Sequence, residues 1–244
     1  LRLTDNGLPV SENEYSLLFA KKSWSVDQVV GNKKIAVLAK DGNKEALDFL
    51  KVNYTAVNSV EALLDTKLKS DLCIISGLTD CTEKEVAMLR AYQEKGGKLL
   101  ILNSKELAKK VYPEHISGWI IPTEGDIMNM ERNDASVFND IDILGLRYFN
   151  NNKREIPTAC NATLMINRND KLVELAGQMK IHAYIDEGTP EDRLKKINSM
   201  RGFTLLEINE GKGQAMISTI STKKAVTDPV AGKILVNMIN TMLK

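Results

Sequence analysis

Between residues 33 and 103 the chain alternates short, continuous apolar runs with longer amphipathic segments. The apolar runs cover 35–39, 72–76 and 99–102, and each is separated from the next by polar turns and helical patterns. A strand that is apolar at every position is covered on both faces, which is typical of a parallel sheet with crossover helices on both sides. The pattern therefore predicts an α/β fold with a doubly wound, mainly parallel sheet.

Capping residues mark the helix boundaries in this part of the chain. Ser59 precedes a helical turn after a short second strand, and Thr82 begins a longer helix with Glu85 at the capping-box position. Gly96 and Gly97 predict the end of that helix, because glycine is favoured just beyond a helix. The next buried strand then begins at Lys98.

The last part of the chain carries a hairpin pattern followed by a helix pattern. "FTLLEINEGKGQAMISTIS" alternates apolar and polar positions on both sides of a turn at 210–213. Asp228 followed by Pro229 predicts the start of a terminal helix. The apolar face of this helix carries Val230, Ile234, Met238 and Met242.

Periodicity is weaker between residues 117 and 200. "CNATLMINRNDKLVELAG" predicts two strands around an Asn-Asp turn, and "PEDRLKKINSMRG" predicts a short amphipathic helix.

The first 30 residues predict an antiparallel hairpin that is separate from this fold. Asp5-Asn6-Gly7 is a turn signal, and an alternating run follows through Tyr15, Leu17 and Phe19. Because a lone hairpin is only marginally stable in water, it needs a sheet to join, and the parallel pattern of the rest does not obviously offer one.

Composition narrows the class of protein. Hydrophobic residues make up 43% and charged residues 27% of the 244 residues, so the chain is expected to fold. The net charge is +1 with both signs interspersed, which argues against a nucleic-acid partner. No apolar run has the roughly 20 residues of a membrane span. The first residue is Leu, so we expect a chain that was processed or cut from something longer.

Ser104 is the first candidate for chemistry, because it stands at a strand-to-helix corner where a nucleophile elbow would lie. Small flanking residues are usual at such an elbow, but here Asn103 and Lys105 flank the serine. The favoured interpretation is that Ser104 caps the following helix. A catalytic relay would need His115 or His182, the two histidines of the chain.

Other site types find less support. Cys73, Cys81 and Cys160 are too scattered for a disulfide framework or a zinc site, and no metal is predicted. Cys81 precedes a helix, but its acidic neighbours oppose a thiolate. No cofactor is predicted, because the turn after the first strand has one glycine where a dinucleotide fingerprint needs three. Asp186, Glu187 and Glu191 are interpreted as a solvated acidic turn.

Four segments together carry a resemblance to a known group. In chain order they are "LRAYQEKGGKLLILNS", "ASVFNDIDILGLRYF", "EINEGKGQAMISTIS" and "DPVAGKILVNMINTML". They resemble the glutamine-amidotransferase-like, flavodoxin-type accessory domains of large bacterial glycoside hydrolases. "DNGLPVSENEYSLLFAKKSW" is similar to the last strands of the immunoglobulin-like domains in family two enzymes of the β-galactosidase and β-mannosidase type.

This resemblance implies two parts and a periplasmic or extracellular location. Residues 1–30 would be the end of an immunoglobulin-like sandwich with its linker, and 31–244 the α/β domain. The group's amidotransferases carry a nucleophilic Cys in a glycine-flanked elbow and a later His-x-Glu, and this chain has neither at the matching positions. The resemblance therefore implies the fold without glutaminase chemistry.

We expect a non-catalytic accessory domain that packs against or oligomerises the catalytic part of a larger carbohydrate-degrading enzyme. The implied partners are other domains of the parent glycoside hydrolase, with carbohydrate and a second copy as further candidates. One alternative is a stand-alone hydrolase or amidotransferase-like enzyme that uses Ser104 with His182 or His115. A third is a carbohydrate-binding module whose stacking surface would be formed by Trp24, Trp119, Tyr148 and Phe149.

Overall fold

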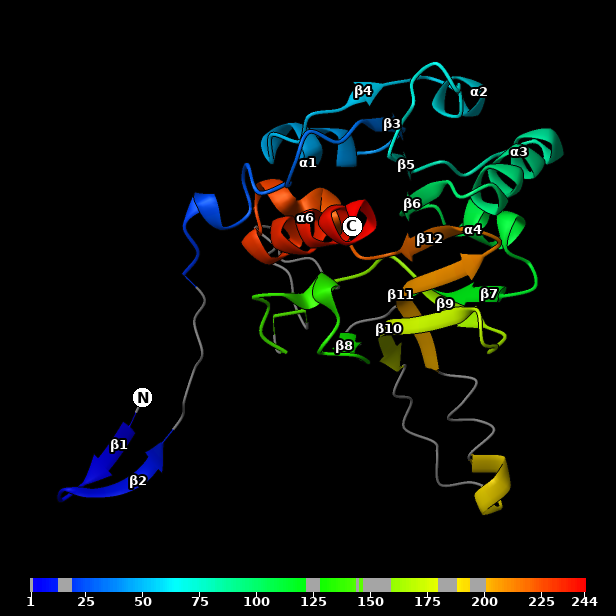
Figure 1. Ribbon diagram of the computed structural model, residues 1–244. Coiled ribbons are helices and arrows are strands. Elements are labelled where there is room, and N and C mark those ends of the chain that lie inside the picture. Colours follow the sequence, from blue (N-terminus) through cyan, green and yellow to red (C-terminus); the bar gives the residue numbers. More distant parts are fainter. Residues whose placement is uncertain are drawn as a thin grey trace.

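The computed structural model describes residues 2–12, 19–121, 128–143, 145–146, 159–179, 188–193 and 201–244. One mixed sheet dominates the fold, with helices on both of its faces (Figure 1). The fold is α/β, as the apolar runs predict.

The parallel half of the sheet has the strand order β4-β3-β5-β6-β12, and every neighbouring pair in it is parallel. These strands are β3 (Ile35–Ala39), β4 (Thr55–Ala56), β5 (Leu72–Ser76), β6 (Lys98–Leu102) and β12 (Gly213–Ser218). Since β4 lies on one side of β3 and β5 lies on the other, the winding direction reverses between β3 and β5. The sheet thus has a topological switch point there.

Two apolar clusters, one on each face of the sheet, form the core. Along β3 the side chains of Ile35 and Val37 belong to one cluster, and those of Ala36 and Leu38 belong to the other. The first face is covered by α1 (Asn43–Phe49) and α6 (Pro229–Leu243). The second is covered by α2 (Val60–Leu63), α3 (Glu83–Glu94) and α4 (Lys105–Val111). The sheet is doubly wound, as predicted.

The helix caps predicted at Ser59, Thr82 and Asp228 are confirmed. Ser59 accepts a hydrogen bond from the Ala62 amide, and Thr82 and Glu85 form the capping box of α3. The Asp228 side chain accepts bonds from the first free amides of α6. Buried residues lie on nearly every side of α6 from 230 to 239, more than the single apolar face that the sequence predicts.

The other half of the sheet is antiparallel. Its strands are β7 (Ile116–Ile120), β8 (Met128–Met130), β9 (Thr163–Ile166), β10 (Leu172–Met179) and β11 (Arg201–Glu210). The hairpin of β11 and β12 is confirmed. Within the described ranges, three short 3-10 helices lie outside the sheet: η1 (Lys22–Trp24), η2 (Ser136–Phe138) and η3 (Thr222–Val226).

The two strands expected around the Asn-Asp turn exist, but they do not pair with each other. β10 pairs with β11 and β8, whereas β9 pairs with β7 and meets β11 at Phe203. The reason is the length of β11: β12 covers only Leu205–Glu210, so β9 can join β11 beyond the end of β12. Of the helix predicted over 190–202, residues 190–193 are helical and 194–200 are outside the described residues. Its last two residues, Arg201 and Gly202, instead begin β11, because they pair with Met179 and Gln178 of β10.

The N-terminal hairpin is confirmed around its turn, as β1 (Arg2–Asp5) and β2 (Leu8–Glu12). Of the alternating run predicted to continue it, Tyr15 and Leu17 are outside the described residues and Phe19 is not in a strand. Asn6 and Gly7 both have positive φ, 48° and 80°, as a tight two-residue hairpin turn requires. The hairpin stands apart from the main sheet in Figure 1, and the main sheet's described strands do not pair with it. No helix among the described residues is both long and apolar enough to cross a membrane.

Residues 24–30 pack on the α/β body, although the resemblance places residues 1–30 in the end of an immunoglobulin-like domain and its linker. Val26 belongs to the first core cluster, and Trp24 and Val29 lie against it. The Val30 amide donates to the Asn240 side chain of α6 at 2.9 Å.

Candidate functional site

A network of polar side chains occupies the carboxyl ends of the parallel strands, where α/β folds most often bind ligands. Asp41 follows β3, Ser76 ends β5 and Asn103 follows β6. Because parallel strands end at the same edge, these three residues lie together at the switch point.

The Asp41 carboxylate is at the centre of this network. Its Oδ1 accepts hydrogen bonds from the Ser76 hydroxyl at 2.7 Å and from the Asn43 amide at 3.1 Å. Its Oδ2 accepts from the Asn43 side chain at 3.1 Å and from Asn103 Nδ2 at 3.5 Å. Both carboxylate oxygens are thus occupied by groups of the chain itself.

Loops from the far end of the sequence extend the network. Thr222 donates to Asn43 Oδ1 at 2.7 Å, and Asn161 donates to Asn103 Oδ1 at 2.8 Å. Ser221 donates to Asn161 Oδ1 at 3.0 Å. Charge-assisted and buried hydrogen bonds of this kind fix positions strongly, so the network ties the strand ends to the loop after β12.

The corner between β6 and α4 has a bent backbone but no free nucleophile. Asn103 adopts a left-handed conformation with φ of 50°. Ser104 is 1% exposed; its hydroxyl donates to the Leu102 carbonyl at 2.9 Å and accepts from the Leu78 amide at 3.0 Å. The hydroxyl therefore links β6 to the loop after β5.

The prediction that the Ser104 side chain caps α4 is wrong. Ser104 occupies the N-cap position, but its side chain makes no hydrogen bond to the helix amides. The hydroxyl instead accepts a hydrogen bond from the Leu78 amide, because the loop after β5 lies close to this corner. The Gly77 amide of the same loop donates to the Leu102 carbonyl.

His115 lies beyond the other end of α4 from Ser104. The seven residues of α4 separate them, a length of about 10 Å at 1.5 Å per residue. His115 Nε2 is 3.0 Å from Glu210 Oε1, and its Nδ1 accepts from the Asn169 side chain at 2.7 Å. His182, the other histidine of the alternative relay, is outside the described residues.

Cys73 and Cys81 lie in surroundings that raise their pKa values. Cys81 precedes α3, and burial, followed by the neighbouring Glu85, raises its pKa to about 11. Burial also raises the pKa of Cys73. None of the three cysteines forms a disulfide, and all three are buried. An activated thiol at the start of α3 is therefore not supported, as the acidic neighbours predict.

The two described aromatic residues of the proposed sugar-stacking surface, Trp24 and Trp119, do not share one face. Trp24 packs against the core cluster under α1 and α6, whereas Trp119 packs against the opposite cluster. Lys105 and Lys109 lie over the Trp119 ring at 5.6 and 5.8 Å from its centroid. Tyr148 and Phe149 are outside the described residues, as are Asp186 and Glu187 of the acidic turn.

Sequence reasoning missed the roles of Asp41, Asn43 and Asn161. Part of the signal for a site at the strand ends was present in the sequence. Asn103 directly follows a strand, and Asp41 follows the first turn residue after a strand. Nothing in the spacing of Asn161 could place it, since its contact to Asn103 spans 58 residues.

Comparisons with known proteins place the fold but no family. No known family matches the chain, and no curated protein matches its sequence. Among solved structures, a cytoplasmic protein of Salmonella typhimurium LT2 has a TM-score of 0.55 at 11% identity. The match covers 86% of this chain and 100% of that one.

Two further solved structures have a fold similar to that of this chain. A ThuA-like protein of Bacteroides uniformis has a TM-score of 0.51 at 11% identity, covering 92% of this chain and 93% of that one. A cold-adapted β-galactosidase of Rahnella has a TM-score of 0.50 at 11% identity, covering 87% of this chain but only 31% of the enzyme. At such identities these likenesses show a shared α/β fold alone.

Proposed function

We propose that this chain is a non-catalytic accessory domain of a larger carbohydrate-degrading enzyme, in which it packs against the other domains. The finer relation to the glutamine-amidotransferase-like domains of family two glycoside hydrolases is part of this proposal. So is the origin of residues 1–30 in a preceding immunoglobulin-like domain.

The state of the β6–α4 corner is the observation that carries the proposal. The alternative, a hydrolase or amidotransferase-like enzyme that uses Ser104, needs a nucleophile that is exposed at the corner and paired with a base. Here Asn103 is held by Asn161 and Asp41, while the Ser104 hydroxyl is buried in two backbone contacts. His115, the described histidine, lies at the far end of α4.

Exposed apolar residues near the start of the chain support a neighbouring domain as the partner. Leu8 and Val10 of the hairpin are 71% and 63% exposed, and Phe19 and Val30 are 88% and 72% exposed. Apolar side chains gathered along one segment are typical of a surface that another protein part covers. The likeness to a segment making up 31% of a β-galactosidase is consistent with such an arrangement.

Turnover assays on the purified chain test the absence of catalysis. We expect no hydrolysis of aryl glycosides, aryl esters or glutamine above background, and no labelling of Ser104 by a fluorophosphonate probe. The matched variants are Ser104→Ala and, at a half-exposed serine remote from the corner, Ser70→Ala. Turnover that Ser104→Ala abolishes and Ser70→Ala preserves would refute the proposal.

A further inference from the structure

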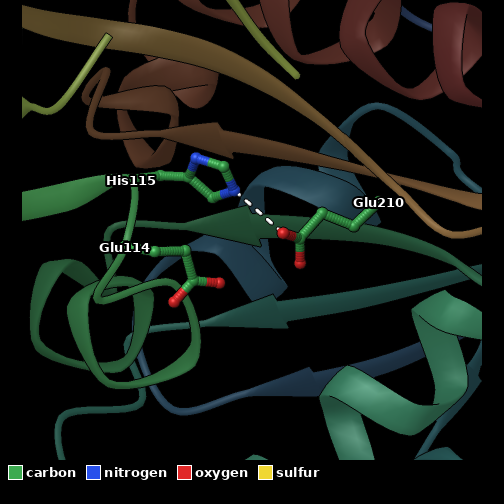
Figure 2. A group of neighbouring side chains, drawn as sticks. All are labelled: Glu114, His115 and Glu210. Atoms are coloured by element: carbon green, nitrogen blue, oxygen red, sulfur yellow. Dashed lines mark hydrogen bonds and ion pairs between the residues drawn. The ribbon is translucent and has the colours of Figure 1, made fainter. Parts of the chain in front are cut away.

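The amino end of the parallel strands, opposite the Asp41 network, holds a second cluster of ionisable side chains. Glu114 and His115 lie between α4 and β7, and Glu210 ends β11 (Figure 2). One ligand atom from each residue lies within 4.8 Å of the others. We propose that Glu114, His115 and Glu210 bind a divalent transition-metal ion, for which Zn²⁺ is the best-fitting common ion.

The donor set suits zinc. One imidazole nitrogen and two carboxylate oxygens are all common zinc ligands, and three protein ligands with a water make a frequent tetrahedral site. Ligand atoms around tetrahedral zinc lie about 3.4 Å apart, given metal–ligand bonds near 2.1 Å. His115 Nε2 and Glu210 Oε1 are already 3.0 Å apart, so the exposed Glu114 needs the main adjustment.

The scaffold around the histidine is rigid. His115 is 2% exposed, and its amide donates to the Tyr112 carbonyl at 3.0 Å. The Tyr112 hydroxyl donates to Gln93 Oε1 at 2.6 Å, and Gln93 Nε2 donates to the Ile208 carbonyl at 2.9 Å. These buried bonds join α3, the end of α4 and β11, so the imidazole is held in place beside the carboxylates.

In the absence of a metal, two cationic side chains balance the charges of the two carboxylates, and both cations are exposed enough to turn away into solvent. Arg90 forms a close ion pair with Glu114, and Lys171 Nζ is 3.7 Å from Glu210 Oε1. The Arg90 and Lys171 side chains are 36% and 56% exposed. A divalent ion would neutralise the same two charges while Arg90 and Lys171 turn to solvent.

Metal binding also requires a change of tautomer at the histidine. The Asn169 side chain donates to Nδ1, so Nε2 carries the ring proton and donates to Glu210. When the metal takes Nε2, the proton moves to Nδ1, and the Asn169 side chain has to turn over to accept it. This turn exchanges its bonds to the Asn167 carbonyl and the Lys171 amide for water, which its exposed position allows. The net charge of the ring does not change in this step.

Titration of the untagged chain with zinc sulfate, followed by calorimetry, tests the proposal. We expect saturable binding of one Zn²⁺ per chain, with Mg²⁺ at the same concentration giving none. Glu114→Gln and Glu210→Gln should each weaken zinc binding at least tenfold. Glu207→Gln, on the same strand, and His182→Gln are matched controls that should leave it unchanged.

Arg90→Gln gives a result of opposite sign, because it frees Glu114 from its cation. Zinc affinity should rise several-fold in this variant, and circular dichroism should show that each variant is folded. The imidazole resonances of the two histidines provide a second readout, since zinc should shift His115 and not His182. Absence of saturable zinc binding would overturn the site, and so would a zinc affinity in Glu114→Gln and Glu210→Gln equal to that of the unmodified chain.

Discussion

Gly77 determines how closely the loops after β3 and β5 approach each other. It has φ of 65°, a conformation that glycine adopts without strain. A Cβ at this position would lie 2.6 Å from Asp41 Cβ and 3.1 Å from the Asp41 backbone nitrogen. The absent side chain thus allows Asp41 to reach Ser76 and complete the polar network.

Replacing Gly77 with alanine should destabilise the domain by about 2–3 kcal/mol, through backbone strain and displacement of Asp41. Urea unfolding followed by circular dichroism measures this change. Gly118→Ala is the matched control, because its nearest atom, Met165 Sδ, is 4.0 Å from the added Cβ. We expect the control to change stability by less than about 1 kcal/mol. Equal effects at both glycines would contradict the role given to Gly77.

At the scale of the element, α3 shows how a local signal defines a helix. Glu85 Oε2 accepts hydrogen bonds from the Thr82 amide at 2.8 Å and the Thr82 hydroxyl at 2.7 Å. The backbone bond from Thr82, followed by that from its side chain, lowers the pKa of Glu85. The folded helix start therefore stabilises the ionised carboxylate.

Glu85→Gln should lower stability by about 0.5 kcal/mol at pH 7, because the charge-assisted part of the capping box is lost. A carboxyl group with a depressed folded pKa stabilises the fold above its unfolded pKa of about 4.3. The difference between wild type and variant should therefore vanish as pH falls from about 4.3 through the lower folded pKa. Glu83→Gln removes a first-turn charge without this bond and should have a smaller effect. A pH-independent difference would contradict the assignment.

Elements defined by local patterns could be predicted closely, and elements that depend on distant pairing could not. β3, β5 and the start and end of α3 match the sequence prediction because apolar runs and caps are local. The pairing of β9 could not be predicted, since it depends on where β12 stops along β11. The same holds for the two side-chain clusters, whose contacts from Ser76 to Asp41 and from His115 to Glu210 span 35 and 95 residues.

At the scale of the whole molecule, the question is where the independently stable body begins. The hairpin pairs only with itself among the described strands, whereas residues 24–30 contribute to the core and contact α6. Removal of a core residue such as Val26 leaves a cavity, which is destabilising.

Two truncated chains locate that boundary. A chain of residues 19–244 should melt within about 2 °C of the full chain, because the core is intact. A chain of residues 31–244 should melt at least about 5 °C lower, since it lacks Trp24 and Val26. Differential scanning calorimetry measures both. A large loss on removing 1–18, or none on removing 1–30, would show that the packing argument misplaces the boundary.

The position of β12 between β6 and β11 has a consequence for synthesis on the ribosome. β6 is complete at Leu102 and can pair with β5 on one side, but β12, its parallel neighbour on the other side, begins at Gly213, and the helix that covers it ends at Leu243. At roughly 5–20 residues per second, the β6 edge of a nascent chain is unpaired on the order of ten seconds. An open, apolar strand edge is a template for wrong pairing. This domain should therefore depend on chaperones during translation more than a fold whose neighbouring strands are made in succession.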